Sequence, residues 1–227
     1  MAVITISRKL GSMGSYIGQK LAERIGYDYV DKQCMSQIMK DYGFSRFDYI
    51  YDTIPSMKEL FDEYRDNTIN FLATVIMSLA QHDNVVIAGR GSFGLLNSYS
   101  DVINIRITAP ENCRIQRVME QRKISEIEAK AIVLKNDKVR RHFVESDFRF
   151  AYGNTANFDL ILDTSIVPPD MCVDWLEQIY SINKEKRHDS RHCVNIIDVE
   201  PVLEKHISDM LASFKADKEP VLYQIEQ

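Results

Sequence analysis

A glycine-containing segment follows the first apolar run of the chain and could bind phosphate. Residues 2–6 (AVITI) are almost wholly apolar, and residues 7–24 (SRKLGSMGSYIGQKLAER) carry Gly11 and Gly14 before a helical pattern begins. A strand, a glycine loop and a helix, in this order, place backbone N–H groups around a phosphate. The lysine that normally reaches the terminal phosphates is absent from its usual place. On these residues alone, a phosphate cradle and a plain structural turn both stay open.

Basic residues in three segments could complete such a site. They are Arg8 and Lys9 before the loop, Arg90 after residues 84–88, and Arg140 and Arg141 within NDKVRRHF (136–143). An arginine fork grips phosphate by two hydrogen bonds. Arg90 follows a predicted buried strand, and open α/β sheets bind ligands at this end of their strands, so we expect it to bind a phosphate rather than form a surface salt bridge. For the other four residues, an exposed basic surface is the alternative.

Other residue types predict no further site. The four cysteines are far apart without C-x-x-C spacing, and the five histidines share no spacing typical of a metal site or a general base. We therefore expect no metal held by a cluster of protein side chains. Arg114, Arg117 and Arg122 recur along one predicted helix, and their spacing favours a solvated helix face over nucleotide contact.

Composition restricts the class of protein. A net charge of −5 argues against non-specific nucleic-acid binding, which depends on Lys and Arg. The apolar runs are far shorter than the roughly 20 residues that span a bilayer, and the first residues lack a signal-peptide pattern. Scattered thiols suit a reducing compartment. We expect a cytoplasmic protein without nucleic-acid or membrane partners.

Short apolar runs alternate with helical patterns along most of the chain. The runs predict strands at residues 2–6, 27–31, 84–88, 102–107 and 158–163. Between them, helices are predicted in residues 15–25, 56–82, 110–122 and from 125 and 168 onward, and Ser125 with Glu128 forms a capping box. This alternation predicts an α/β fold of three layers around a parallel sheet.

The last part of the chain has a different composition. Residues 184–192 (KEKRHDSRH) are charged and predict a linker, and residues 201–215 show a helical pattern. The extension over residues 184–227 could be a cap, a homo-oligomer contact or a partner-binding element, and the sequence does not distinguish these roles.

Several of these segments together resemble the cytidylate kinase-like family of P-loop nucleoside monophosphate kinases. The family loop, glycine-alanine-glycine-lysine-glycine-threonine, aligns with Gly11, Ser12, Met13, Gly14, Ser15 and Tyr16. The kinase-like subgroup has serine-arginine-x-x-glycine-serine-x-glycine, which is similar to residues 7–14. Gly89-Arg90-Gly91 resembles the family's glycine-arginine-aspartate, residues 136–143 its lid, and residues 152–165 its last strand. The resemblance covers about residues 2–182.

The resemblance implies a three-layer P-loop kinase fold with a central parallel sheet of about five strands. It implies one kinase domain over residues 1–183, with a helical monophosphate-binding insertion at about 34–82 and a lid at about 123–152. It also implies ATP and Mg²⁺ as cofactors and small-molecule nucleotides as partners.

The resemblance also implies roles for individual residues. Residues 11–16 would hold the donor phosphates, with Ser12, Gly14 and Ser15 using backbone N–H groups. Asp31, Gly89, Arg90 and Gly91 would form the acceptor site. Arg140 and Arg141 would close the lid, and Arg141 matches the family pattern better. Gly14 and Tyr16 replace the lysine and the magnesium-binding hydroxyl, so Arg8 or Lys9 would supply the missing charge.

These implications favour ATP-dependent phosphoryl transfer to CMP or dCMP. The missing lysine weakens this prediction, because losing one such electrostatic stabiliser costs on the order of 10²–10³ in rate. Two alternatives stay open. One is a nucleotide- or anion-binding module with the kinase fold and little catalysis, and the other is a kinase for a non-nucleotide small acceptor.

Overall fold

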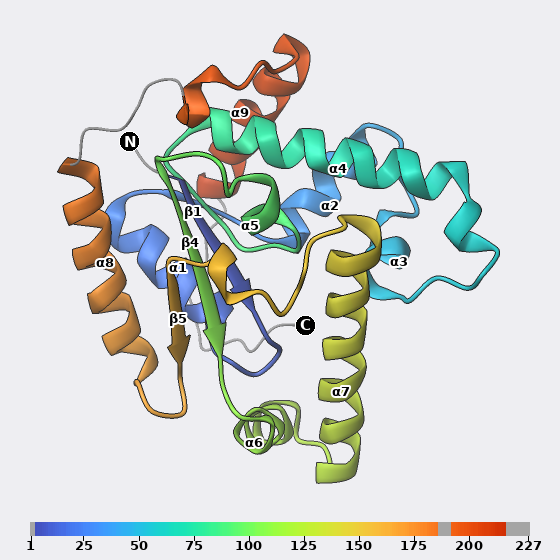
Figure 1. Ribbon diagram of the computed structural model, residues 1–227, viewed down its shortest axis with the longest axis vertical. Coiled ribbons are helices and arrows are strands. Elements are labelled where there is room, and N and C mark those ends of the chain that lie inside the picture. The colour runs from blue at the N-terminus through green and yellow to red at the C-terminus, as the bar shows by residue number, and fades with distance from the viewer. Residues whose placement is uncertain (1–2, 186–191, 217–227) are drawn as a thin grey trace.

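The computed structural model describes residues 3–185 and 192–216. In these residues, parallel strands form one sheet in the order β2-β3-β1-β4-β5 (Figure 1). The strands are β1 (Val3–Arg8), β2 (Asp28–Val30), β3 (Val85–Ile87), β4 (Val102–Thr108) and β5 (Leu160–Asp163). Since β1 lies between β3 and β4, the segments that follow these strands meet at one edge of the sheet. The predicted parallel sheet of about five strands is confirmed.

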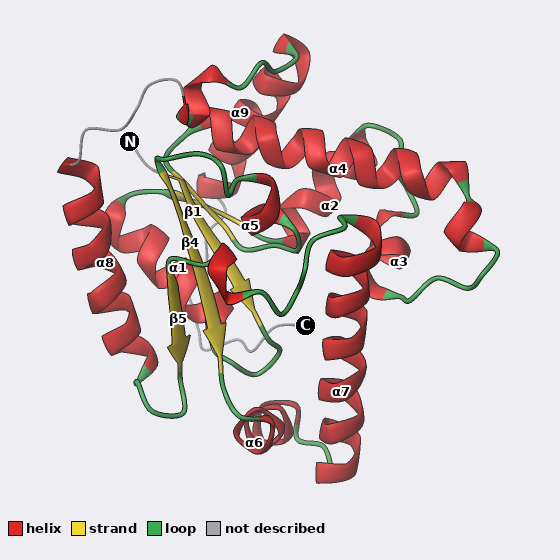
Figure 2. Ribbon diagram, viewed as in Figure 1, coloured by secondary structure: helices red, strands yellow, loops and turns green. Residues whose placement is uncertain are grey.

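Helices cover both faces of the sheet (Figure 2). On one face, α1 (Gly14–Ile25) and α8 (Pro169–Glu185) share a core with alternate residues of β1, such as Ile4 and Ile6. On the other, α2 (Lys32–Asp41) and α4 (Glu63–His82) pack against Val3 and its neighbours. All six residues of β1 are buried, as expected of a parallel strand covered on both faces.

Apart from α9, the remaining helices of the described residues connect the elements of the sheet and its covering layers. They are α3 (Phe47–Asp52), α5 (Ser92–Leu95), α6 (Glu111–Arg122), α7 (Glu126–His142), the π-helix η2 (Phe143–Asp147) and the 3₁₀ turns η1 (Glu59–Phe61), η3 (Thr155–Asn157) and η5 (Val194–Ile196). The capping box of α7 is confirmed: the Ser125 hydroxyl accepts from the Glu128 N–H, and the Glu128 carboxylate accepts from the Ser125 N–H. None of the helices in the described ranges is long and apolar enough to cross a membrane.

The helix predicted over residues 56–82 is shorter than expected. It begins at Glu63, because the Asp62 carboxylate caps it by accepting from the Tyr64 N–H at 3.1 Å. Before it, the Glu59 carboxylate accepts from the Ser56 N–H and hydroxyl, at 2.8 and 2.7 Å, and so closes a separate turn.

The described C-terminal residues belong to the same core as α4. In α9 (Pro201–Ala216), Leu203 and Ile207 are almost fully buried, and the Val194 N–H donates to the Asp101 carboxylate at 3.0 Å. The helix predicted over residues 201–215 is thereby confirmed. Most of the predicted charged linker, residues 186–191, and residues 217–227 of the predicted extension lie outside the described residues.

Candidate nucleotide phosphate site

The loop between β1 and α1 turns its carbonyl groups toward the rest of the protein. Every carbonyl from Arg8 to Ser12 accepts a hydrogen bond. In chain order, the donors are Arg140 Nη1 (3.2 Å), the Ser12 N–H (3.1 Å), Arg114 Nη1 (3.2 Å), Arg117 Nη1 (3.1 Å) and Thr164 Oγ1 (3.0 Å). In a trans peptide, the N–H points opposite to the preceding carbonyl. The N–H groups of Gly11 and Met13 therefore point away from α6 and β5, as a phosphate cradle requires.

Three residues of the loop have an unusual backbone conformation or side-chain environment. Gly11 has φ +77° and a Cβ there would lie 2.8 Å from the Arg114 carbonyl oxygen, so only glycine fits. Met13 caps α1 with a left-handed backbone at φ 64°. The Ser12 Oγ is fully buried and has no hydrogen-bond partner among the described residues. A buried hydroxyl of this kind costs free energy unless a ligand or water pairs with it.

The last two predicted loop residues lie in the first turn of α1. Ser15 is half-buried at its second position. Tyr16 directs its hydroxyl to Asp170 at the start of α8, where it donates at 2.6 Å. Tyr16 therefore contributes to the packing of α1 against α8, and its hydroxyl is not turned toward the loop.

Position 14 has no room for a side chain. A Cβ on Gly14 would contact the side-chain stem of Arg8, at 2.9 Å from its Cγ, and would lie 3.3 Å from the Ile107 Cβ. Arg8 itself is 7% exposed. The space beside the first residue of α1 is therefore filled by the Arg8 stem, which comes from the end of β1.

Arg90 lies directly after β3 and is only 5% exposed. Its Nη1 donates to the Tyr51 carbonyl at the end of α3, and its Nη2 lies 3.7 Å from Asp52 Oδ1. The guanidinium carbon is 4.0 Å from the centroid of the Tyr51 ring. Its Nε has no hydrogen-bond partner in the described part of the chain.

Burial, together with the nearby cations Arg140 and Arg8, lowers the pKa of Arg90 to about 10, although Tyr51 and Asp52 oppose this. The group still carries its charge at neutral pH. Arg140 is 6% exposed, and its Nε donates to Asn136 Oδ1 at 2.6 Å. Three buried guanidinium groups, from β1, the β3 loop and α7, are thus close enough to repel one another. Such a cluster is suited to an anion.

The glycines beside Arg90 are required by close packing. A Cβ on Gly89 would lie 3.1 Å from the Met35 Cε, and Gly91 has φ +83° with the Phe148 ring 2.8 Å from a Cβ there. Asp31 caps α2, because its Oδ1 accepts from the N–H groups of the second and third residues of that helix. Because Asp31 directly follows β2, its carboxylate fixes the start of α2 at the end of that strand.

The two other predicted basic residues lie at the border of the site. Arg141 is exposed, whereas the preceding Arg140 turns inward. Lys9 is half-buried, and burial lowers its pKa; Arg114, Arg106 and Arg141 lower it further, while Asp137 opposes this. Lys9 therefore lies near charged groups of α6, α7 and β4.

Two of the three arginines of α6 differ from the prediction. We expected Arg114 and Arg117 on a solvated face, which is wrong for both: Arg114 is 2% exposed, and Arg117 is half-buried with its Nη1 also donating to Thr164 Oγ1 at 2.8 Å. Arg114 forms a two-pronged pair with Asp137 of α7, at 3.1 and 2.8 Å. Helical spacing alone does not reveal partners that lie in other segments. Arg122 is exposed, as expected.

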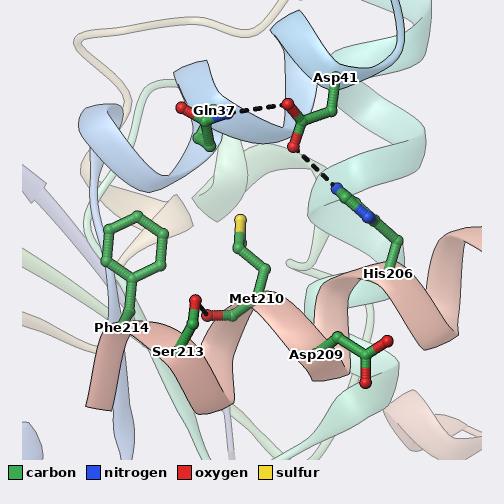
Figure 3. A pocket seen from close by; sticks show the side chains of 7 residues that line it. All are labelled: Gln37, Asp41, His206, Asp209, Met210, Ser213 and Phe214. Carbon is green, nitrogen blue, oxygen red and sulfur yellow. Dashed lines mark hydrogen bonds and ion pairs between the residues drawn. The ribbon is translucent and has the colours of Figure 1, made fainter. Parts of the chain in front are cut away.

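A separate pocket of about 350 Å³ lies between α2 and α9 (Figure 3). His206 Nε2 is 3.0 Å from Asp41 Oδ2, and the other lining residues are Gln37, Asp209, Met210, Ser213 and Phe214. Two carboxylates in its lining would repel a phosphate, so this pocket does not extend the phosphate site. Within the described ranges, no group of three or more His, Cys, Asp or Glu residues could hold a metal ion.

Comparisons with known proteins identify the family of the chain. The sequence profile of the Cytidylate kinase-like family matches residues 3–166. A cytidylate kinase of Ignicoccus hospitalis is 25% identical over 181 residues, which are 79% of this chain and 99% of that protein.

Solved structures share the fold. An uncharacterized protein from Eubacterium ventriosum has a TM-score of 0.61 at 22% identity, and the match covers 80% of this chain and 99% of that one. A shikimate kinase from Bacteroides thetaiotaomicron has a TM-score of 0.50 at 9% identity, over 79% and 98% of the two chains. The fold is thus that of the P-loop kinases, and the family supports a kinase of nucleotides or other small molecules. With most of its length matched by one family profile, the chain belongs to the cytidylate kinase-like family.

Proposed function

We propose that this protein transfers a phosphoryl group from ATP to a nucleoside monophosphate, with CMP or dCMP as the acceptor. The observation that carries the proposal is the gathering of Arg8, Arg90 and Arg140 beside a loop whose carbonyls all point into the protein. Phosphoryl transfer needs in-line placement of two substrates and cations around the transferred group, and it needs little covalent chemistry from the protein.

The residues present fit the phosphates of a nucleotide. The N–H groups of Gly11 and Met13, the first turn of α1 and the buried Ser12 hydroxyl offer donors to the donor phosphates. Arg90 would bind the phosphate of the acceptor, which is not transferred. Arg140 would bridge the two phosphate groups from α7.

The loop does not fit the usual protein ligand for Mg²⁺, because the hydroxyl of Tyr16 is bonded to Asp170. Mg²⁺ in kinases keeps several waters and binds largely through substrate phosphates, so it would enter with ATP.

The proposal is tested by incubating the purified full chain with ATP, Mg²⁺ and a panel of nucleoside monophosphates. We expect diphosphate product, formed fastest with CMP or dCMP. If ATP raises the melting temperature while no diphosphate forms, the proposal fails and the protein is a binding module. If product forms only when sugars or other small metabolites replace the monophosphates, the kinase chemistry stands and the nucleotide acceptor is wrong.

Arg90→Ala tests the acceptor site. We expect the KM for the acceptor to rise by about 10- to 100-fold, since a hydrogen bond to a charged group contributes about 1.5–3 kcal/mol. The KM for ATP should change little. Arg24→Ala removes an arginine that pairs with Asp174 and Glu177 at the surface, and it serves as the control. Unchanged acceptor kinetics in Arg90→Ala would show that the acceptor lies elsewhere.

A further inference from the structure

We infer that Arg8 supplies the catalytic cation that a lysine on the loop would otherwise provide, and that it does so from the end of β1. This inference rests on the proposed function and names the residue that makes the loop competent despite Gly14. It also explains why positions 8 and 14 have these residues together.

The first observation is that side chains at positions 8 and 14 would occupy the same space. The stem of Arg8 occupies the volume that a side chain at position 14 would need, since a Cβ there would meet both its Cβ and its Cγ. A lysine at position 14 is therefore excluded while position 8 carries a side chain, and the side chain present there is a cation. The chain holds a cation in this volume from the strand side instead of the helix side.

The second observation is the way Arg8 is held. It is the last residue of β1 and is paired in the parallel ladder with Ile107, and its carbonyl accepts from Arg140 Nη1 at 3.2 Å. Its side chain is 7% exposed, and its charge contributes to lowering the pKa of Arg90. Arg8 thus lies between the first turn of α1 and the Arg90 cluster, on the path between donor and acceptor phosphates.

Lys9, the other candidate, is directed elsewhere. Successive residues at the end of a strand point to opposite faces of the sheet. The charged neighbours of Lys9 are Asp137, Arg114, Arg106 and Arg141, and neither Arg90 nor Arg140 is among them. Lys9 is therefore on the α6 and α7 side of the loop.

The position of Arg8 is suited to the chemistry. The positive end of the α1 dipole and the buried Ser12 hydroxyl lie in the same loop, so a guanidinium group beside them adds charge where it develops on the transferred phosphoryl group. A guanidinium also binds two oxygens at once, which fixes the orientation of that group.

Arg8→Met is the main test, because methionine keeps an unbranched stem beside Gly14 and removes only the charge. With the full chain, ATP, Mg²⁺ and the best acceptor, we expect kcat to fall on the order of 10²–10³-fold. The KM for the acceptor should change less than about threefold. Arg8→Lys should keep kcat within about tenfold of the wild type, since it restores the charge without the fork.

A double variant sharpens the test. Arg8→Gly removes both Arg8 atoms that a Cβ at position 14 would meet, so Arg8→Gly/Gly14→Lys should regain at least tenfold of the kcat that Arg8→Gly loses. Gly14→Lys alone should fail to show a gain, because the Arg8 stem fills that space. Arg24→Ala, at the other end of α1, is the control for a general loss of arginine.

The outcomes separate this inference from the proposed function. If the wild type transfers phosphate and Arg8→Met turns over within threefold of it, the inference is overturned and the proposed function stands. A larger loss in Lys9→Ala than in Arg8→Met also overturns it. If the wild type transfers nothing, the readout is the ATP-induced rise in melting temperature. Loss of this rise in Arg8→Met but not in Arg24→Ala then supports a phosphate-binding Arg8 although the proposed function has failed, and an unchanged rise overturns the inference.

Discussion

The loop after β1 and the segment around Arg90 are built in opposite ways. In the loop, the carbonyls from Arg8 to Ser12 are all held by donors of the protein, so the opposite side of the backbone is turned toward the proposed donor phosphates. At Arg90 the cation itself is held, because the Tyr51 carbonyl and Asp52 lie where an acceptor phosphate would bind.

The two halves of the proposed site therefore differ in how much conformational change ligand binding requires. The donor half is preorganised, since its geometry is fixed before a nucleotide arrives. In the proposed acceptor half, Arg90 must exchange an internal partner for the phosphate. α3 is anchored in the core, because Phe47, Ile50 and Tyr51 are 0%, 2% and 3% exposed, whereas the Asp52 side chain at its end is exposed. We therefore expect the Asp52 side chain to release Arg90 when the acceptor binds.

The largest expected effect is that of Arg114→Ala, which removes hydrogen bonds that support the loop proposed to bind the donor phosphates. It leaves two carbonyls and the partly buried Asp137 carboxylate without their donor, so unfolding free energy should fall by about 3 kcal/mol. The affinity for ATP should fall as well, because the loop loses its support.

The measurements are urea unfolding and ATP titration of the same samples. Ile207→Ala is the matched control, since this core truncation in α9 should cost about 2–4 kcal/mol and leave ATP affinity unchanged. If Arg114→Ala loses stability while binding ATP normally, the loop does not depend on α6 for its shape.

A smaller effect is expected from Asp52→Asn, which sharpens the acceptor half. The substitution weakens the internal partner of Arg90, so the acceptor KM should fall by about two- to fivefold, in keeping with the small energy of a partly exposed ion pair. The KM for ATP should stay the same. Steady-state kinetics with both substrates varied will measure this, and Asp174→Asn is the control because Asp174 pairs with Arg24 at the surface instead. A rise in acceptor KM would mean that Asp52 assists binding.

The smallest expected effect is a pH-dependent change in stability, which arises in the turn that Ser56 and Glu59 close near α3. Hydrogen bonds from Ser56, with a further one from the Tyr49 hydroxyl, lower the pKa of Glu59 to about 2. A depressed carboxyl pKa contributes stability above the ordinary value of 4.5, and this contribution is lost as pH falls toward 2.

The melting temperature of Glu59→Gln should therefore be below that of the wild type near neutral pH, and the difference should shrink as pH falls from 4.5 toward 2. Glu63→Gln, an exposed change in α4, provides the comparison. A difference that stays constant with pH would mean that the charge of Glu59 does not hold the turn.

Much of the fold follows from local pattern. Apolar runs and helical periodicity predicted the strands, the parallel sheet and the capping box of α7, because each depends on residues close in the sequence. The start of α4 was missed, because Asp62 as a cap competes with a hydrophobic pattern that continues on both sides of it. The loop and the GRG segment were likewise visible as motifs.

The sequence by itself determined that this chain forms an α/β kinase fold, with glycine and arginine motifs at the ends of its strands. Only the tertiary structure decided which cations share one site: Arg8, Arg90 and Arg140 gather, Arg141 stays exposed, and Arg114 and Arg117 hold the loop. The physical reason is that periodicity fixes the face on which a side chain lies, whereas its partners come from other segments of the chain, as Tyr51 does for Arg90 and Leu10 for Arg114. The proposed replacement of the loop lysine by Arg8 depends on such a contact, because a side chain at position 14 would meet Arg8, and the sequence does not show that the two positions touch.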